Sequence, residues 1–240
     1  MRYFFLILLY TCFCTSMFAQ TPHFKVTERT IVKDSDGVVY PYKLWRYLVM
    51  QGDYDVHPRD TLNKKTDFLL YKLTGQQKNQ RLEHMSKPAE SEFFRTGKAF
   101  GVFKTADIEN NKINLKEEKG KIIVLNFWFI NCPPCRMEIP ALNELVEAYK
   151  GDDRVKFIGI ALDARSDLEE FLKTFPFKYT VVENGRYLAE RYGIRSFPTH
   201  VIINQDGKVY FHTTGLAMNT VYWLKKSITE LLNQSSVAQH

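Results

Sequence analysis

Cysteine is scarce in this sequence. Four cysteines occur among 240 residues, and two of them, Cys12 and Cys14, lie in an apolar run at the start of the chain. The other two, Cys132 and Cys135, are separated only by two prolines, and no second closely spaced pair follows. A structural zinc site requires four ligands, and the six histidines show no close paired spacing. The sequence therefore disfavours a zinc site.

Other features are missing as well. There is no block of lysine and arginine, so the net charge of +6 indicates a solvated surface rather than a nucleic-acid-binding face. There is no glycine-rich nucleotide-binding motif, and we expect neither a soluble cofactor nor a metal. Past the first apolar run, no stretch is long enough to span a membrane. A content of 45% hydrophobic and 25% charged residues is typical of a globular chain with one sizeable core.

The first residues have the pattern of a secretory signal peptide. An arginine precedes a short apolar run, and Ala19 supplies a small residue for cleavage. We therefore expect residues 1–19 to be removed and the protein to reach the periplasm or cell envelope. An uncleaved N-terminal anchor is the alternative. Export would leave Cys132 and Cys135 as the only cysteines, in a compartment that favours oxidised pairs.

Residues 20–97 are expected to form a small, mostly β N-terminal module followed by a linker. Its runs of aromatic and β-branched residues favour strands, and Asp36–Gly37 favours a hairpin turn between two of them. The expected elements are strands over 24–33, 38–50 and 67–74, a loop over 51–65, a helix over 75–85 with a capping box of Thr74 and Gln77, and a linker over 86–98. No motif in this module indicates a particular chemical activity.

Residues 98–237 show a different pattern, in which short strands alternate with helices. A near-continuous apolar run over 121–130 is typical of a central strand that is covered on both faces. The other expected elements are strands over 101–108, 112–118 and 155–162, a hairpin over 199–212 that turns at Asp206–Gly207, and helices over 133–150, 167–175 with Asp167 as cap, 188–193 and 220–232. This order predicts an α/β domain with a mixed sheet and helices on both faces.

The pair Cys132–Cys135 follows a predicted buried strand and opens a predicted helix. Free backbone N–H groups and the positive end of the helix dipole favour a thiolate at the first cysteine. That thiolate is the nucleophile in disulfide exchange, and Cys135, about one turn further on, can attack the resulting mixed disulfide. Pro133 and Pro134 suit the first turn, where N–H groups are not needed. A purely structural disulfide is disfavoured, because so short a loop gives little stabilisation.

These motifs carry a resemblance. The segments 119–149, 155–163 and 192–215 combine a CxxC after an apolar strand, a Gly-Ile-x-x-x-Pro-Thr segment that begins at Gly193, and a strand hairpin beyond it. In this combination the chain resembles the TlpA-like family of thioredoxin-fold thiol–disulfide reductases of the bacterial cell envelope. The likeness covers roughly residues 99–235 and implies a thioredoxin-like fold, with a mixed central sheet flanked by helices.

The resemblance also implies roles for three residues beside the cysteines. In thioredoxin-like folds the proline that corresponds to Pro198 follows a cis peptide bond and faces the disulfide, and the residue before it, here Phe197, offers backbone groups to a bound partner chain. A glutamate at the position of Glu138 is implicated in proton handling at the buried thiol. The alternative for Glu138 is an ordinary first-turn acid that complements the helix dipole.

Two positions depart from thioredoxin itself. Asn126 stands where thioredoxin has a buried aspartate in the strand before the pair, which removes one candidate proton acceptor and raises the interest of Glu138. Asn131 stands where thioredoxin has a tryptophan, so substrate preference need not follow that of thioredoxin. Trp128 is expected to pack beside the site rather than to act in the chemistry.

We therefore expect an exported thiol–disulfide oxidoreductase that reduces disulfides of client proteins and is recharged by a membrane electron donor. Cytochrome c maturation is one client pathway that the sequence does not select. Three alternatives stay open: a disulfide oxidase or isomerase of the same fold, a peroxidase acting on hydroperoxides, and a binding module in which residues 20–97 capture a partner. The peroxidase is disfavoured because Phe129 occupies the position of the threonine in a Thr-x-x-Cys motif.

Overall fold

A computed structural model describes residues 26–63 and 66–237 of the chain. The predicted signal peptide, including Ala19, lies outside the described residues. Within the described ranges, no helix combines the length and the apolar character that crossing a membrane requires.

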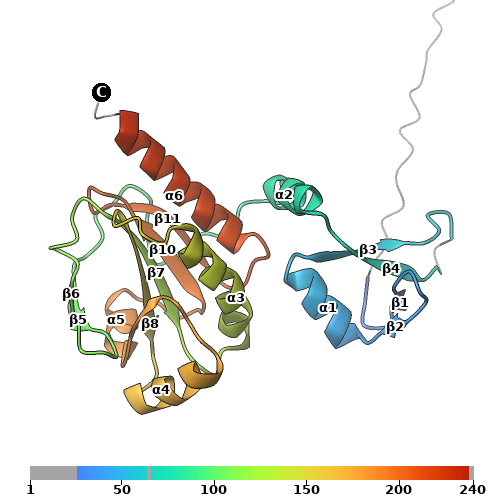
Figure 1. The fold of residues 1–240 in the computed structure, drawn as a ribbon, viewed down its shortest axis with the longest axis horizontal. Helices are drawn as coiled ribbons and strands as arrows, with labels where there is room; N and C mark the ends of the chain where they lie inside the picture. Colours follow the sequence, from blue (N-terminus) through green and yellow to red (C-terminus); the bar gives the residue numbers. More distant parts are fainter. Residues whose placement is uncertain (1–25, 64–65, 238–240) are drawn as a thin grey trace, which may run out of the picture.

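The larger part of the molecule is built on a five-stranded mixed sheet in the order β11-β10-β7-β8-β9 (Figure 1). The central strand β7 is buried along its whole length, as its apolar run predicts. It pairs in parallel with β8 and antiparallel with β10. The strands span Ile122–Trp128 (β7), Val155–Ala161 (β8), Thr180–Val182 (β9), Thr199–Ile203 (β10) and Val209–Thr214 (β11).

Helices and a hairpin cover the two faces of this sheet. Successive side chains of a strand point to opposite faces, so Val124 and Trp128 join one core cluster while Leu125 and Phe127 join the other. The first face is covered by α3 (Pro133–Ala148), α4 (Arg165–Thr174) and α6 (Thr220–Val237). The second is covered by α5 (Arg186–Arg191) and the hairpin of β5 (Lys104–Ala106) and β6 (Lys112–Asn114). The α/β fold class is therefore confirmed.

The N-terminal part has its own small sheet, in the order β2-β1-β4-β3, with one helix packed on it (Figure 1). Its core is a separate cluster made of Val32, Trp45, Phe68 and Leu70. The elements are β1 (Val32–Lys33), β2 (Val39–Tyr40), α1 (Tyr42–Met50), β3 (Tyr54–Pro58) and β4 (Phe68–Lys72), followed by α2 (Gly75–His84). The turn at Asp36–Gly37 joins β1 to β2, and Gly37 has a positive φ of 85°.

Helix α2 begins as the capping box predicts. The Thr74 side chain accepts from the Gln77 N–H at 3.3 Å, and the Gln77 side chain accepts from the Thr74 N–H at 2.9 Å. This reciprocal arrangement satisfies two N–H groups that the first turn of a helix leaves free. The sequence thus located this boundary to the residue.

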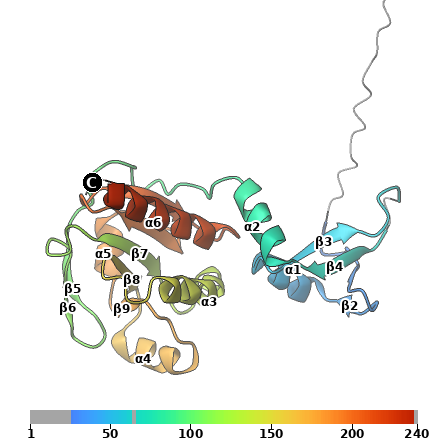
Figure 2. The same cartoon turned by 45° about the horizontal axis from the view of Figure 1, so that its top comes forward.

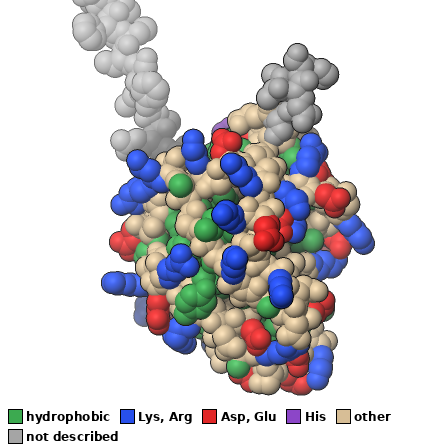
Figure 3. Space-filling model, turned by 90° about the vertical axis from the view of Figure 1, so that its left-hand side faces the viewer, with side chains coloured by type: hydrophobic (Ala, Val, Ile, Leu, Met, Phe, Trp, Pro, Cys, Tyr) green, Lys and Arg blue, Asp and Glu red, His purple; other side chains and the backbone are tan. Residues whose placement is uncertain are grey.

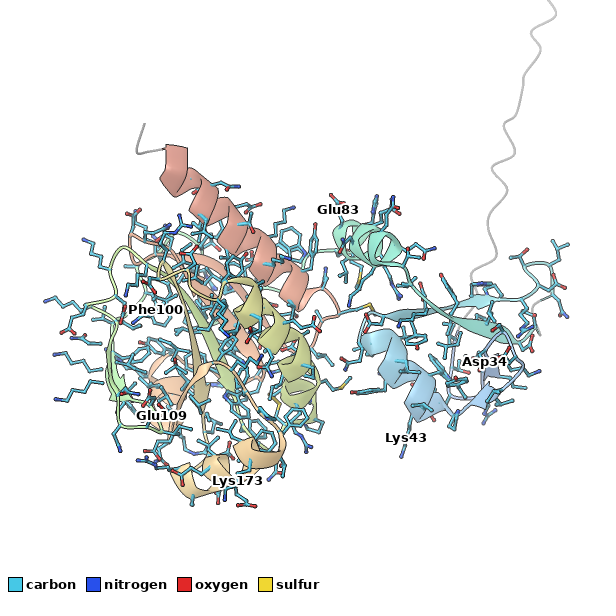
Figure 4. All side chains as sticks on the ribbon, in the orientation of Figure 1. Asp34, Lys43, Glu83, Phe100, Glu109 and Lys173 are labelled. Carbon is cyan, nitrogen blue, oxygen red and sulfur yellow. A yellow bond between two sulfur atoms is a disulfide. The ribbon has the colours of Figure 1, made fainter. Side chains whose placement is uncertain are left out.

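Two predictions for the N-terminal part are wrong. The segment 42–50 is helix α1 rather than strand, because its apolar residues recur at helical spacing and place Trp45 in the core while Lys43 points outward (Figure 4). The predicted loop 51–65 contains β3, which pairs antiparallel with β4. Strand β3 is at the sheet edge, where Pro58 and acidic residues are tolerated.

Smaller differences concern element ends. Of the predicted strand 24–33, only Val32–Lys33 is a strand among the described residues. Helix α4 begins at Arg165 after Ala164, and Asp167 lies in its first turn, where its charge complements the helix dipole, instead of capping it. The short strand β9 was not predicted. It is a three-residue edge strand, too short to show a periodic pattern.

The predicted linker packs onto the larger part of the molecule. The Ser91 N–H donates to Nδ1 of His212 on β11 at 3.1 Å, and Phe94 and Phe100 join the core cluster that covers the second face of the sheet. Figure 2 shows α2 between the two parts. Direct contact between them includes a hydrogen bond of 3.4 Å from the Gln51 side chain to the Met137 carbonyl on α3.

Candidate active site at the start of helix α3

The cysteine pair sits where the central strand passes into α3, a helix that covers the first face of the sheet. Strand β7 ends at Trp128, and Cys132 is the N-cap residue of α3. Cys132 Sγ accepts a hydrogen bond from the Cys135 N–H at 3.2 Å, while Pro133 and Pro134 occupy the first helical positions. The first cysteine therefore lies at the positive end of the helix dipole, the environment that lowers the pKa of a thiol.

Cys132 and Cys135 form a disulfide. Their Cα atoms are 5.3 Å apart, within the ordinary range for such a bond. Both side chains are largely covered, with exposed fractions of 3% for Cys132 and 1% for Cys135. The residues on either side of Cys132, Asn131 and Pro133, are exposed, so the segment that carries the first cysteine lies at the surface.

An aspartate that sequence reasoning missed holds the loop before Cys132. The Ile130 N–H donates to Asp163 Oδ2 at 2.8 Å. Asp163 follows the end of β8, which lies parallel to β7, so the two strand ends meet at the same edge of the sheet. A polar residue directly after the predicted buried strand 155–162 was the signal that could have found it.

Pro198 and Phe197 lie at the same edge. The Phe197–Pro198 peptide bond is cis, in agreement with the resemblance. Strand β10 begins directly after Pro198 and pairs Thr199 with Phe127, which places Pro198 beside the end of β7. Pro198 is buried and Phe197 half-buried, and the Phe197 ring contacts the Phe129 ring with centroids 5.4 Å apart. The segments that carry Cys132 and Pro198 therefore adjoin each other.

A buried acid–base pair connects α3, the helix of the disulfide, to β10. Glu138, one turn after Cys135 on α3, has its Oε2 2.8 Å from Nε2 of His200 on β10. The exposed fractions of the two side chains are 4% and 0%. Sequence reasoning singled out Glu138 and missed His200. Its signal was a lone histidine within an apolar strand, two residues after Pro198.

Several polar atoms around this pair have no hydrogen-bond partner among the described residues. They are both side-chain atoms of Asn126, Glu138 Oε1, His200 Nδ1, Trp128 Nε1 and the Tyr179 hydroxyl. Burial, and secondarily the nearby Glu138 carboxylate, raise the pKa of Tyr179 well above its usual range. Tyr179 therefore stays protonated and neutral beside the pair.

The two departures from thioredoxin are placed differently. Asn126 is 1% exposed and pairs in register with His200, so both side chains point to the face of the sheet that α3 covers. Asn131 is exposed next to Cys132. Trp128 is fully buried, and its ring packs against Phe171 and Phe177. The packing role expected for Trp128 fits these contacts.

A pocket of about 220 Å³ opens beside the site, between the N-terminal part and the sheet domain. Its walls include Gln51, Lys78 from α2, Met137 and Glu138 from α3, and Tyr222 from α6. Within the part of the chain that the structure describes, no group of three or more His, Cys, Asp or Glu is arranged to hold a metal ion. On the face drawn in Figure 3, basic and acidic side chains are interspersed.

Comparison with known proteins gives consistent matches to the part of the chain that holds this site. The AhpC/TSA family matches residues 96–212. The thiol-disulfide oxidoreductase ResA of Bacillus thuringiensis (strain Al Hakam) is 36% identical over 123 residues, which are 50% of this chain and 70% of that protein. ResA of Halalkalibacterium halodurans is 32% identical over 136 residues, 55% of this chain and 77% of that protein.

A solved structure adds the fold. A thiol:disulfide interchange protein of the DsbE kind from Chlorobium tepidum matches with a TM-score of 0.53 at 25% identity, covering 58% of this chain and 99% of that one. A thioredoxin-like sheet, a CxxC disulfide at a helix N-terminus and a neighbouring cis-proline thus coincide with the sequence match. The chain belongs to the thioredoxin-like family that includes the ResA proteins, and it is a thiol–disulfide oxidoreductase.

Proposed function

We propose that the protein is exported and reduces disulfide bonds of client proteins in the cell envelope through Cys132 and Cys135. The observation that carries this proposal is the placement of Cys132 as N-cap of α3, with its sulfur accepting the Cys135 N–H. A sulfur in this position is stabilised as a thiolate, and a thiolate is what attacks a client disulfide. The predicted signal peptide 1–19 supports export.

The reaction has two exchange steps. The Cys132 thiolate attacks one sulfur of the client disulfide, and the other client sulfur leaves as a thiolate. The Cys135 thiol then loses its proton and attacks Cys132 Sγ in the mixed disulfide, which releases the second client sulfur. The client gains two electrons and two protons, and the Cys132–Cys135 disulfide is re-formed. A membrane electron donor of the envelope returns the pair to the dithiol, and apocytochromes c are one class of client that needs reduced cysteines.

Three neighbours support these steps. The resemblance supports a role for Pro198, before β10, in facing the disulfide and for Phe197 in offering its backbone to the client chain. Glu138, one turn after Cys135, handles the proton of the resolving thiol. Glu138→Gln should therefore change the pH dependence of exchange. An unchanged pH profile would leave Glu138 as an ordinary acid of the first helical turns.

We assign catalysis to a domain at 98–237 and propose that the module at 20–97 serves it. The contact of Gln51 with the Met137 carbonyl brings the module to within two residues of Cys135 along α3. A client bound at the active site would therefore meet the end of α1 as well. This arrangement favours a role of the module in selecting clients rather than in the chemistry.

The experiment is the equilibrium reduction potential of Cys132–Cys135 in the mature chain, measured against glutathione or dithiothreitol buffers. Thioredoxin-like reductants lie near about −270 mV and strong oxidants near about −120 mV. A value below roughly −220 mV supports a reductase that is fed by a membrane donor. A value above roughly −180 mV would reverse the direction of electron flow and make the protein a disulfide donor or isomerase.

A further inference from the structure

Glu138 and His200 form a buried ionisable pair, so a second titratable side chain accompanies the glutamate that the resemblance singles out. Its two side chains come from different elements, α3 and β10, and meet at 2.8 Å with almost no exposure to solvent. A buried ionisable pair is weak evidence for stability, because apolar residues of similar volume often serve a core equally well. The position of the pair therefore says more about its role than its contribution to stability does.

The pair joins the two segments that form the active site. Glu138 is three residues after Cys135 and shares its helix face. His200 is two residues after Pro198, on the strand that begins beside the cysteine loop. The pair thus links the helix that carries Cys135 to the strand that follows Pro198.

The hydrogen-bond pattern leaves the pair able to take up a proton. An ionised carboxylate only accepts hydrogen bonds, so with Glu138 ionised the contact requires Nε2 of His200 to donate to Glu138 Oε2, and the neutral ring then has Nδ1 as its free nitrogen. Neither Nδ1 nor the second carboxylate oxygen, Oε1, has a hydrogen-bond partner among the described residues. A buried polar atom without a partner lowers the stability of a fold, so a purely structural pair would be poorly built.

We propose that His200 completes a buried proton store with Glu138, and that this store takes up the proton that the Cys135 thiol loses when it resolves a mixed disulfide. This inference rests on the proposed function and adds a residue to it. His200 acts through Glu138 and is a positioning and proton-holding residue, whereas the cysteines carry out the exchange.

In the resolution step, one proton and one electron pair are passed on in turn. The S–H bond of Cys135 breaks and its proton passes to the pair, which changes from carboxylate with neutral imidazole to carboxylate with imidazolium. The Cys135 thiolate forms the bond to Cys132 Sγ, and the bond between Cys132 and the client sulfur breaks. That client sulfur leaves with the electron pair and takes a proton from solvent, while the pair releases its proton to solvent through the pocket that Glu138 lines and returns to its first state. The combined charge of Cys135 and the pair therefore does not change while the proton passes between them.

Other charged and titratable groups face the pair from the elements around it. Tyr179 lies close enough to feel the Glu138 carboxylate, and it stays neutral. The pocket that Glu138 lines also carries Lys78 from α2, Glu144 from α3, and Tyr222 and Lys225 from α6. His212 lies on the opposite face of the sheet, against Ser91. The pocket gives Glu138 a short route for exchanging protons with solvent.

The test follows resolution by Cys135 directly. The chain without residues 1–19, in its reduced form, reacts with the aromatic disulfide dithionitrobenzoate, and the second release of coloured thiolate reports the attack of Cys135 on Cys132 Sγ. We expect His200→Gln to slow this release at least about tenfold near pH 6 and to converge with wild type above about pH 9, where the thiol ionises without help. The glutamine side chain can still donate an N–H to Glu138, but it cannot take up a proton in this pH range.

Further variants test whether Glu138 and His200 act together. Glu138→Gln alone and the double variant should both be as slow as His200→Gln, because residues that act as one unit are not additive. His212→Gln is the matched control, since it removes another buried imidazole of the same sheet and should leave the shape of the pH profile unchanged. A His200→Gln profile identical to wild type, or slower by the same factor at every pH, would overturn the proposal.

A second measurement does not depend on a variant that folds. In the wild-type protein, the ring nitrogen signals of His200 should titrate at different pH values in the oxidised and reduced forms, while those of His212 should not change with redox state. Identical titrations of His200 in both forms would overturn the proposal. Failure of the proposed function looks different, because an oxidising potential or inactive export would leave the resolution step and its pH profile measurable.

Discussion

The two parts of this chain bury very different cores. Strands β7 and β8 have seven residues each, and the side chains of the five-stranded sheet form extensive apolar clusters on both of its faces. In the N-terminal module, β1 and β2 have two residues each, and one cluster of four buried residues holds the sheet to α1. Because buried apolar area supplies most of the stability of a fold, the catalytic domain holds far more of the free energy of unfolding.

The candidate active-site residues lie in the part with the larger core, and the N-terminal module, with the smaller core, contributes few of them. The disulfide, the cis-proline segment and the buried Glu138–His200 pair all lie on α3, on β10 or directly before β10, in the larger part of the molecule. The module contributes Gln51 and part of a pocket wall at the edge of that site. The larger core therefore carries the disulfide and its neighbours, and the smaller unit contacts them at one edge of the site.

The strongest test of this division removes one sulfur at a time. Cys132→Ser should reduce turnover of a generic disulfide-bonded protein to the background rate, because the remaining cysteine of the pair, Cys135, is buried inside α3 and does not occupy the N-cap position that favours a thiolate. Cys135→Ser should instead accumulate a mixed disulfide with the client, visible as a covalent adduct on a non-reducing gel. Residual turnover in Cys132→Ser would contradict the assignment of the attacking cysteine.

Matched core substitutions in the two parts come next. Leu142→Ala, at a fully buried position on α3, should lower the free energy of unfolding by about 2–5 kcal/mol and reduce activity at elevated temperature. Leu70→Ala, in the core of the module, should unfold the module while generic turnover persists. Urea unfolding followed by peptide-resolved hydrogen exchange distinguishes the two. Loss of generic turnover in Leu70→Ala would show that the parts depend on each other for folding.

The same contrast explains what the sequence could predict. Long elements with clear periodicity, such as β7 and α3, were predicted within about two residues at each end, in line with the usual uncertainty of boundaries. The capping box of α2 was located because it rests on local hydrogen bonds. In the module, α1 was misread as a strand, since Tyr, Trp and Val favour strands by propensity while their spacing is helical.

The site shows a similar limit. Cys132, Cys135, Pro198 and Glu138 could be identified because they fall in motifs that are compact in the sequence. His200 and Asp163 could not, because their partners are separated from them by 62 and 33 residues and are brought together only by the sheet. Tertiary contacts of this kind leave only a weak local signal, a polar residue within or directly after an apolar strand, and that signal does not name the partner.

A glycine in the domain has less room than a glycine in the module. A Cβ at Gly159 on β8 would lie 2.9 Å from the Phe177 ring and 3.2 Å from Trp128 Nε1. Gly159→Ala should therefore destabilise the domain by about 1–3 kcal/mol through overpacking. Gly75→Ala, at the start of α2, is the control: it meets no atom within 4 Å and should be neutral or stabilising by up to about 1 kcal/mol. Equal effects in thermal unfolding would contradict the difference in packing.

The smallest expected effect concerns the point where the linker joins the domain. Burial lowers the pKa of His212 below its usual value, with Lys87 and Arg95 acting in the same direction and Glu90 opposing them. The neutral ring accepts the Ser91 N–H through Nδ1 at 3.1 Å, which ties the linker to β11. Because the unfolded chain binds this proton more readily, the free energy of unfolding should fall as the pH drops below about 6.5, and should level off once the folded form is protonated too.

His212→Gln separates this contribution from other acid effects. Glutamine can still accept the Ser91 N–H but does not titrate, so the fall in unfolding free energy between about pH 7 and pH 5 should be shallower than in wild type. The readout is the slope from urea unfolding at several pH values, which a uniform loss of stability does not change. Protonation of His212 would also loosen the linker, so hydrogen exchange at Ser91 should accelerate over the same interval in wild type only. An identical slope in the two proteins would mean that acid acts elsewhere and that the linker stays attached to the domain at low pH.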